Sequence, residues 1–470
     1  MTMKSSKYIE RIVEGSIVMN RIIMVCDAFA PTNGIGAVRT TKLAKFFREH
    51  GYEVIVIAEQ KHGYLEDEIL ERDSEGIKVY RVINSKCVQK IISMYNRMIA
   101  PIKQKRYDNL EDRMQINKYT GSLEFHPFQT AHPIIGSFDF LIELLRQYDL
   151  YCSSKHYLNS LEEPTYIFTS IGGNFGIFSS KYLHLKFRRI PLIVDFRDHM
   201  DLYRFSPKYV LWISRLLKRQ ICEEADCITA ISKGICQGIS RKYWGKLHCI
   251  TNGFDSDERK NIIVNDESHD KIRFTYTGAM YGGLFSLSPF FRNFKILIDR
   301  EEIDINKVEF CFAGRESAYE VFISEAKEYG LDANCVYCGK ITRKESLKLQ
   351  MESDALLVAT FNTKIERGVI TGKVLEYMGS NKPIIAIING DMPRSELREI
   401  IHNAGLGFAY EEADGEVSNI KLCNYILEKY HEFIESGKII HSPNEKVLKK
   451  YDYKYLGKRM LRIIESTKGD

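Results

Sequence analysis

Four residues near the start of an expected short helix could together bind an anionic, sugar-bearing ligand. In the segment RGVITGKVLEYM, Thr371 and Gly372 lie where the helix begins, and the free N–H groups and dipole of a helix start favour an anion such as phosphate. Lys373 adds a positive charge at this end. Glu376 follows one turn later, where its carboxylate could accept hydrogen bonds from two sugar hydroxyls. The alternative is an ordinary capped helix with a solvated lysine and glutamate.

Glycines in the N-terminal half could let another part of the ligand approach the backbone. Gly34 and Gly36 lie between an expected strand at residues 22–26 and the following helix, at the strand end where α/β proteins bind ligands. The pattern differs from the dinucleotide-binding fingerprint because Arg39 occupies the position of its third glycine. Taken alone, this Gly-x-Gly pair indicates a phosphate or sugar contact only weakly.

Charged residues follow two other expected strands. Arg197 and Asp198 come after the strand at 190–195 and should face the same cleft as the glycines. They could orient a hydroxyl or a phosphate, or only form a salt bridge within a loop. Asp255 and Asp257 have the spacing of metal ligands, but they follow a turn in a charged stretch, so we expect no metal site there.

Apolar strands that alternate with helical stretches predict an α/β fold with two doubly wound parallel sheets. The first expected strands lie at residues 22–26, 54–58, 77–83, 166–169, 190–195, 227–231 and 247–250. After a charged, core-poor stretch, the second set lies at 273–277, 308–313, 335–338, 355–359 and 384–388. We expect Rossmann-like domains at 1–258 and 272–448, a linker at 259–271, and a C-terminal helix at 449–470 that packs back on the first domain. The final helical stretch, 445–465, has an expected weak point at Gly457.

The composition is that of a globular protein with more than one domain. The chain has 470 residues, of which 44% are hydrophobic and 27% charged, and a formal net charge of +5. This charge permits anionic substrates or an anionic membrane surface, and the sequence has no motif that recognises nucleic acid. The 11 scattered cysteines indicate reduced thiols in a cytoplasmic protein. We expect neither a secretory signal nor a membrane span, because no apolar run approaches the ~20 residues that a span needs.

Two segments mix apolar and basic residues. Residues 86–113 and 203–221 could lie on an anionic membrane as amphipathic helices, or could cover the core with a solvated basic face. The solvated arrangement is the commoner outcome. The occurrence of two such segments in one half moves the balance towards surface binding.

The order and spacing of several segments resemble the retaining GT-B glycosyltransferases of family four over nearly the whole chain. The matching segments are VCDAFAPTNGIGAVRTTKLAKFFREHGYEVIVIA, PLIVDFRD, EEADCITAIS, ITNGFD, TYTGAMYGG and TGKVLEYMGSNKPIIAI. The resemblance implies a GT-B fold, in which two Rossmann-like domains face a central cleft. It also implies an enzyme that moves a sugar from a nucleotide-diphosphate donor to a hydroxyl acceptor with retention, without a cofactor or a metal.

The same resemblance implies an acceptor and a location. The acceptor would be a lipid-linked glycan or a polysaccharide, as in the synthesis of bacterial capsule, O-antigen or exopolysaccharide, and the protein would be peripheral to the inner membrane face. Three alternatives stay open, of which a soluble oxidoreductase is the least favoured because neither glycine loop fits the dinucleotide pattern. An epimerase acting on a nucleotide sugar shares the two-domain plan, and a non-catalytic member would bind sugar without turnover.

The resemblance also implies roles for individual residues. Gly278 and the helix start at 371–373 would hold the diphosphate, and Glu376 would bind the ribose hydroxyls. Residues 339–341 would flank the base, and the charged pair at 197–198 would lie near the acceptor and assist catalysis. The implied donor-binding residues are Gly34, Gly36, Gly278, Arg315, Gly339, Lys340, Arg367, Thr371, Gly372, Lys373 and Glu376.

The chain departs from this family at two places. The family's acidic pair is two glutamates separated by seven residues; Glu376 matches the second, but Gly368 takes the place of the first, with Glu366 displaced by two. The arginine and lysine that commonly follow the first C-terminal strand have no counterpart in GAMYGGLFSLS. The available replacements are Arg315, Lys364, Arg367 and Lys373.

Overall fold

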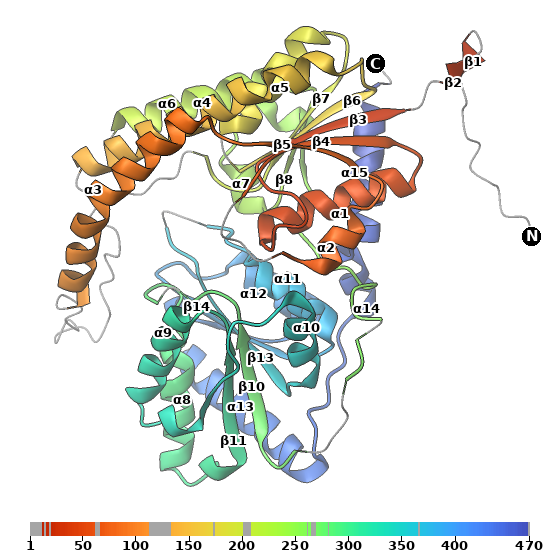
Figure 1. The fold of residues 1–470 in the computed structure, drawn as a ribbon. Coiled ribbons are helices and arrows are strands. Elements are labelled where there is room, and N and C mark those ends of the chain that lie inside the picture. The colour runs from red at the N-terminus through yellow and green to blue at the C-terminus, as the bar shows by residue number, and fades with distance from the viewer. Residues whose placement is uncertain are drawn as a thin grey trace, which may run out of the picture.

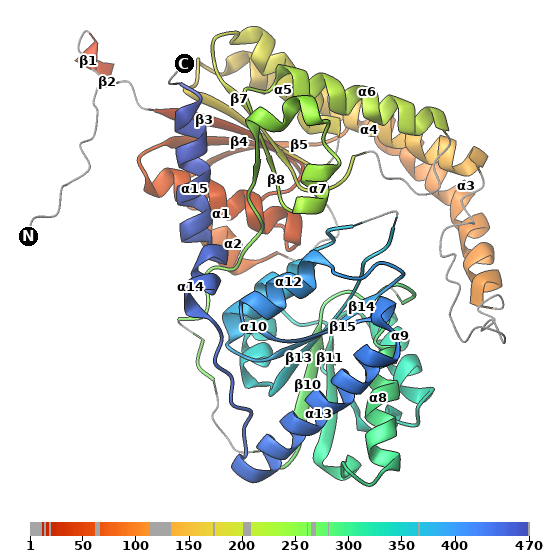
Figure 2. The ribbon, with the colours of Figure 1, turned by 180° about the vertical axis from the view of Figure 1, so that it is seen from behind.

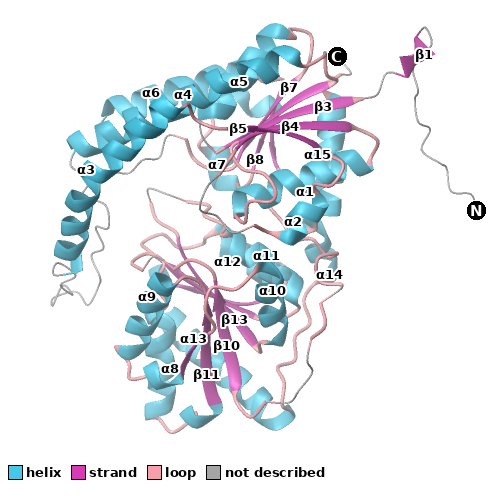
Figure 3. Ribbon diagram, in the orientation of Figure 1, coloured by secondary structure: helices cyan, strands magenta, loops and turns pink. Residues whose placement is uncertain are grey.

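The computed structural model describes residues 12–13, 16–17, 20–61, 66–111, 133–172, 174–200, 208–260, 262–264, 269–280, 282–364 and 367–468. Within these residues, two large parallel sheets form the centres of two lobes, one above the other in Figure 1 and drawn in magenta in Figure 3. The prediction of two doubly wound parallel sheets is confirmed. A short antiparallel pair, β1 (Ile12–Val13) and β2 (Ser16–Ile17), is separate from both.

The sheet of the N-terminal lobe has seven strands: β3 (Arg21–Cys26), β4 (Glu53–Glu59), β5 (Lys78–Val82), β6 (Tyr166–Ile171), β7 (Leu192–Phe196), β8 (Cys227–Ala230) and β9 (Leu247–Cys249). Their order across the sheet is β5-β4-β3-β6-β7-β8-β9. Successive side chains of a strand point to opposite faces, so Met24 and Val25 belong to two different core clusters. This sheet is therefore buried on both faces, which explains its continuous apolar strands.

The helices of this lobe are α1 (Ile35–Glu49), α2 (Glu68–Asp73), α3 (Lys86–Glu111), α4 (Pro133–Ser160), α5 (Asn174–Lys186), α6 (Lys208–Glu224) and α7 (Lys233–Gln237). One face of the sheet packs on α1, and the other packs on α4, α5 and α6 (Figure 1). No described helix is long and apolar enough to cross a membrane.

The sheet of the C-terminal lobe has six strands: β10 (Ile272–Thr277), β11 (Val308–Ala313), β12 (Cys335–Tyr337), β13 (Ala355–Phe361), β14 (Ile384–Asn389) and β15 (Gly407–Glu411). Their order is β12-β11-β10-β13-β14-β15. The edge strand β15 was not predicted from the sequence. It begins at Gly407, where φ is +133° and the backbone passes against Ile384, and glycine at this position weakens the strand signal of the short apolar run at residues 408–410.

The helices of this lobe are α8 (Ser288–Asp299), α9 (Glu316–Lys327), α10 (Arg343–Glu352), α11 (Gly372–Tyr377), α12 (Glu396–Asn403), α13 (Glu416–Ser436) and α14 (Glu445–Leu448). The face around Phe274 and Phe310 packs on α8, α9 and α13, whereas α11 and α12 cover the other face. Figure 1 shows α11 and α12 at the end of this lobe nearest the N-terminal lobe. Short 3-10 helices are η1 (Arg241–Lys246), η2 (Ile305–Lys307), η3 (Asp332–Asn334), η4 (Met378–Ser380), η5 (Glu412–Asp414) and η6 (Lys449–Tyr451).

The last helix, α15 (Tyr453–Ser466), lies on the N-terminal lobe, and Figure 2 shows it beside α1. Leu456 and Ile464 are buried in the core of that lobe. The expected weak point at Gly457 is wrong, because the chain breaks at Asp452, the N-cap of α15. A Cβ at Gly457 would lie 2.4 Å from Cγ of Phe46, so glycine allows α15 to approach α1 closely.

Candidate functional site

The predicted diphosphate residues of the C-terminal lobe lie together. Thr371 caps α11, and its Oγ1 accepts a hydrogen bond from the backbone N–H of Lys373 at 3.1 Å. The ammonium of Lys373 donates to the carbonyl of Ala279 at 2.7 Å and lies 5.0 Å from the centre of the Tyr276 ring. Gly278 has φ of +93°, and a Cβ there would be 3.2 Å from Cε of Lys373. The turn after β10 and the start of α11 therefore share one surface.

Lys373 is a partly compensated cation of this region, as is Arg259, whose Nε and Nη1 atoms are buried without a hydrogen-bond partner in the part of the chain that the structure describes. Burial lowers its pKa to about 8, and the negative charge of Glu376 opposes that shift only in part. Among the described residues, no carboxylate lies within salt-bridge distance of its ammonium. An anion bound beside Lys373 would restore its pKa, so the site favours a negatively charged ligand.

Glu376, the predicted ribose-binding residue, already accepts two hydrogen bonds within the protein. Its carboxylate accepts from Nη1 of Arg343 at 2.7 Å and from Nε2 of Gln350 at 2.5 Å. A cavity between the lobes contains Arg343, Gly372 and Glu376 in its lining, together with Val38 of the N-terminal lobe. Glu376 thus faces the space between the lobes while bound to its neighbours.

Arg343 joins three parts of the chain and was not predicted. Besides Glu376, it binds Glu258 of the segment between the lobes at 2.9 Å and lies 3.7 Å from Asp67, the N-cap of α2. A sequence signal was present, because the capping box that begins at Thr342 places Arg343 in the first turn of α10, directly after the segment expected to flank a base.

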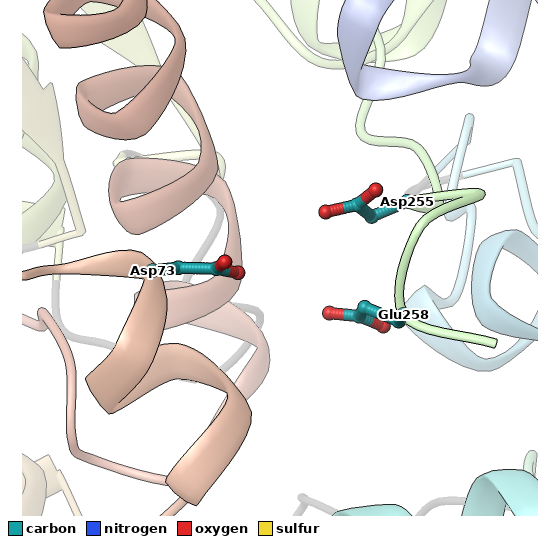
Figure 4. Close-up of side chains that lie close together, drawn as sticks. All are labelled: Asp73, Asp255 and Glu258. Atoms are coloured by element: carbon teal, nitrogen blue, oxygen red, sulfur yellow. The ribbon is translucent and has the colours of Figure 1, made fainter. Parts of the chain in front are cut away.

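A second charged cluster lies beside Arg343, and Figure 4 shows its three carboxylates directed towards one another. Asp73, Asp255 and Glu258 have oxygens within 4.8 Å of one another, as metal ligands would. The ammonium of Lys42 occupies their centre: it pairs with Asp73 and lies 2.6 Å from Asp255 and 2.7 Å from Glu258. Asp257, the other half of the metal-like spacing, pairs instead with Lys454 at 2.7 Å.

These charges are buried, although the sequence suggested a charged, core-poor linker here. Glu258 and Arg259, at the boundary of the expected linker, are both less than a tenth exposed. Burial alone would raise the pKa of Glu258, but Arg343 and Lys42 outweigh it and lower the pKa to about 2. Glu258 is therefore held by buried ion pairs, whereas Arg259 donates to the carbonyl of Glu376 at 2.6 Å and is in no ion pair among the described residues.

In the N-terminal lobe, Arg197 forms an ion pair with Asp27, so the salt bridge that was one of the two alternatives for this residue is made with a distant carboxylate. Arg197 also donates to the carbonyl of Gly36 at 2.9 Å, and a Cβ at Gly36 would lie 2.4 Å from its Nη1. The absence of a side chain at Gly36 thus leaves space for Arg197 of the same lobe. Gly34 has open space around it. Desolvation raises the pKa of Asp198, against the opposing effect of Arg197.

Arg39, which occupies the third glycine position, is a core residue. Its guanidinium binds both carboxylate oxygens of Asp195, at 2.8 and 2.9 Å, and donates to the carbonyl of Ile250 at 3.0 Å. Burial would raise the pKa of Asp195, but Arg39 outweighs it and lowers the pKa. Arg39 is therefore not available to bind a dinucleotide phosphate, because its guanidinium group already holds α1 against Asp195 of β7.

The remaining predicted donor-binding residues lie on loops that follow strands of the C-terminal lobe. Arg315 occupies the N-cap position of α9 without a capping hydrogen bond from its side chain and is exposed, as are Lys340 and Arg367. Gly339 has φ of +78°, and its carbonyl accepts from the backbone N–H of Gly314 at 2.9 Å. Lys364 lies 3.7 Å from Asp391, and Glu366 is outside the described residues.

Gly368, the residue in place of the family's first glutamate, touches the other lobe. Its φ is +72°, and a Cβ there would lie 2.6 Å from Cα of Gly234 in α7 and 3.2 Å from Oε2 of Glu396. Glu396 itself accepts from the backbone N–H groups of Lys233 at 3.0 Å and Gly234 at 3.4 Å. Here the backbones of the two lobes meet, and a larger residue has no room in this arrangement.

No family model and no curated protein matches the sequence. Solved structures match in three dimensions. Sucrose-phosphate synthase from Thermosynechococcus elongatus aligns with a TM-score of 0.54 at 12% identity, covering 96% of this chain and 99% of that one. A UDP-forming trehalose-phosphate synthase from Burkholderia xenovorans, in complex with glucose-6-phosphate, gives 0.56 at 12%, covering 95% and 100%. The chain has the GT-B fold.

A third GT-B structure, the lipopolysaccharide outer core galactosyltransferase WaaB in its apo form, gives a TM-score of 0.54 at 13% identity and covers 95% of this chain and 99% of that one. Identities this low make the likeness one of fold. In the GT-B arrangement of this chain, α11 lies at the end of the C-terminal lobe that faces the N-terminal lobe, and Gly278 lies against Lys373 of this helix.

Proposed function

We propose that the protein is a glycosyltransferase that moves a sugar from a nucleotide-diphosphate donor to a hydroxyl of a lipid-linked glycan or polysaccharide, with retention of configuration. The observation that carries the proposal is Lys373, a cation without a carboxylate partner among the described residues, placed between the lobes of a GT-B fold. The similar structures named above, which include synthases and a galactosyltransferase of sugar substrates, support the same reaction class.

The proposed chemistry needs positive potential at the leaving group. Breaking the bond between sugar and phosphate leaves a nucleoside diphosphate, and its growing negative charge is best stabilised by groups already in place. Lys373 and the backbone N–H groups at the start of α11 would supply that potential without a metal. The acceptor hydroxyl would attack from the face that the diphosphate leaves, and a donor phosphate oxygen would take its proton, so no covalent enzyme residue is required.

Ribose would bind at Glu376. A carboxylate offers about four acceptor positions, and Arg343 and Gln350 use one hydrogen bond each. Two ribose hydroxyls can therefore share Glu376 with these residues. Asp198 would assist near the acceptor, and a lipid-linked acceptor would bring this cytoplasmic protein to the inner membrane face.

Calorimetry with UDP-, GDP- and ADP-sugars tests the proposal, and we expect one of these donor classes to bind. Lys373→Ala and Glu376→Ala should each weaken binding by about 1–3 kcal/mol, as for a lost charged hydrogen bond. Lys295→Ala, which removes a surface lysine paired with Asp299 on α8, is the matched control and should bind as the wild type does. Failure of every donor to bind would remove the proposal, and conversion of a donor without acceptor would indicate an epimerase.

Donor affinity should also depend on pH. In the free protein Lys373 titrates with a pKa of about 8, and an anion binds its protonated form, so affinity should fall by up to about tenfold per pH unit above this value. A nucleotide-sugar diphosphate keeps its charge over this range. Lys373→Arg keeps its charge at every pH tested and should bind without this dependence. Calorimetry from pH 7 to 9 measures both, and a flat wild-type profile would show that Lys373 does not contact the anion.

A further inference from the structure

Helix α4 carries large apolar side chains on its solvent face as well as on its core face. Phe138, Leu141, Leu145 and Tyr148 recur at spacings of three and four residues and are between 38% and 52% exposed. On the opposite side, Leu150 is completely buried in the core. A helix of a monomeric soluble protein normally presents polar residues on the side away from the core, so this stripe is unusual.

Neighbouring helices carry similar stripes. On α3, Met94 and Met98 are more than 60% exposed, while Tyr95 turns inward and donates to Asp139 of α4 at 2.8 Å. On α6, Trp212 is 64% exposed and Leu216 follows one turn later. The helices α3, α4, α5 and α6 pack in succession, each on the next, and form one outer layer of the N-terminal lobe (Figures 1 and 2).

The same layer is basic at α3 and α6. Lys86, Lys90 and Arg97 are exposed on α3, and on α6 Arg215 and Arg219 are exposed beside Trp212. Apolar and aromatic residues with flanking lysines and arginines are the combination that binds anionic membrane surfaces. An excess of like charge opposes the pairing of two copies of this layer.

We propose that the outer layer formed by α3, α4, α5 and α6 docks on an anionic lipid bilayer. The apolar stripes enter the interface between headgroups and acyl chains, and the basic side chains meet the anionic headgroups. The docking surface rests on the proposed function and extends it. A membrane-docked protein would meet a lipid-linked acceptor at the lobe that is expected to bind the acceptor.

Vesicle sedimentation tests the surface. The full-length protein should bind vesicles that contain phosphatidylglycerol, bind vesicles of phosphatidylcholine alone at least tenfold more weakly, and lose affinity as salt rises. The triple variant Met94→Glu/Leu141→Glu/Trp212→Glu should lose at least tenfold of its affinity. The control variant Val417→Glu/Ile420→Glu/Ile440→Glu changes residues that are equally exposed on or after α13 and should bind like the wild type.

Tryptophan fluorescence gives a second readout, because the chain has only two tryptophans. In a Trp244→Phe background, Trp212 emission should shift to the blue with anionic vesicles and be quenched by brominated lipid. Absence of vesicle binding at low salt, unchanged binding of the triple variant, or a dimer in solution that this variant dissociates would each overturn the proposal. Donor calorimetry of the wild-type protein is an independent readout: donor binding without vesicle binding refutes only the membrane surface, and vesicle binding without donor binding refutes only the donor site. The triple variant should keep the donor affinity of the wild type.

Discussion

Replacing Lys42 by methionine should destabilise the protein by about 3–5 kcal/mol, as expected when one partner of a buried ion pair is removed. Its side chain is 2% exposed and is the shared partner of Asp73, Asp255 and Glu258. Without the ammonium, three buried carboxylates would face one another, and only Arg343 would remain to compensate Glu258. Methionine keeps most of the side-chain volume, so the loss isolates the charge.

Urea unfolding followed by circular dichroism measures this effect, and Lys45→Met is the matched control. Lys45 also pairs with Asp73, at 2.7 Å, but is 23% exposed, so its removal should cost at most about 1 kcal/mol. The pH dependence has a defined sign. Glu258 has a pKa of about 2 in the folded protein against an ordinary 4.5, so its stabilisation is complete above the higher value and is lost as pH falls towards the lower.

The difference between wild type and Lys42→Met should accordingly shrink as the pH falls through this range. Equal stability of the two proteins at neutral pH would contradict the assignment of Lys42 as the centre of the charged cluster. The same result would reopen the carboxylate cluster in Figure 4 as a metal site, which equilibrium dialysis with calcium or manganese would then address.

Gly368→Glu, which restores the glutamate that the resembling family has at this position, should reduce donor-dependent turnover at least tenfold. Two effects add. The φ of +72° costs a residue with a Cβ about 1–2 kcal/mol, and that Cβ would lie 2.6 Å from Cα of Gly234, which forces the lobes apart. Small-angle scattering should show a larger radius of gyration for the variant.

Gly368→Ala and Gly330→Ala separate the two effects. Gly330 has φ of +69° but open space around it, so alanine there incurs the backbone penalty alone. Alanine at 368 meets the other lobe as well, and its extra loss of stability and turnover measures the contact between the lobes. A Gly368→Glu enzyme that binds donor more tightly than the wild type would instead mean that the lobes reopen to admit the glutamate.

The fold was accessible from the sequence because its signals are local. Apolar runs such as residues 22–26 and 384–388 must be strands buried on both faces, and helical stretches between them require parallel crossovers. The start of α11 was equally readable, since Thr371 caps the helix through a hydrogen bond to a residue two positions away. β15 escaped prediction because its pairing with β14, rather than its own residues, makes it a strand.

The charged contacts depended on the tertiary structure. Lys42 and Asp255, which form an ion pair, are 213 residues apart in the sequence. Arg197 forms its ion pair with Asp27, 170 residues away, rather than with the adjacent Asp198. Burying a charge is costly unless opposite charges or hydrogen bonds compensate it, and which groups are available to do so depends on how the lobes pack. The sequence thus determined the two sheets and the anion-favouring helix start. The packing of the two lobes decided which charges pair with one another and which, like Lys373, have no carboxylate partner among the described residues.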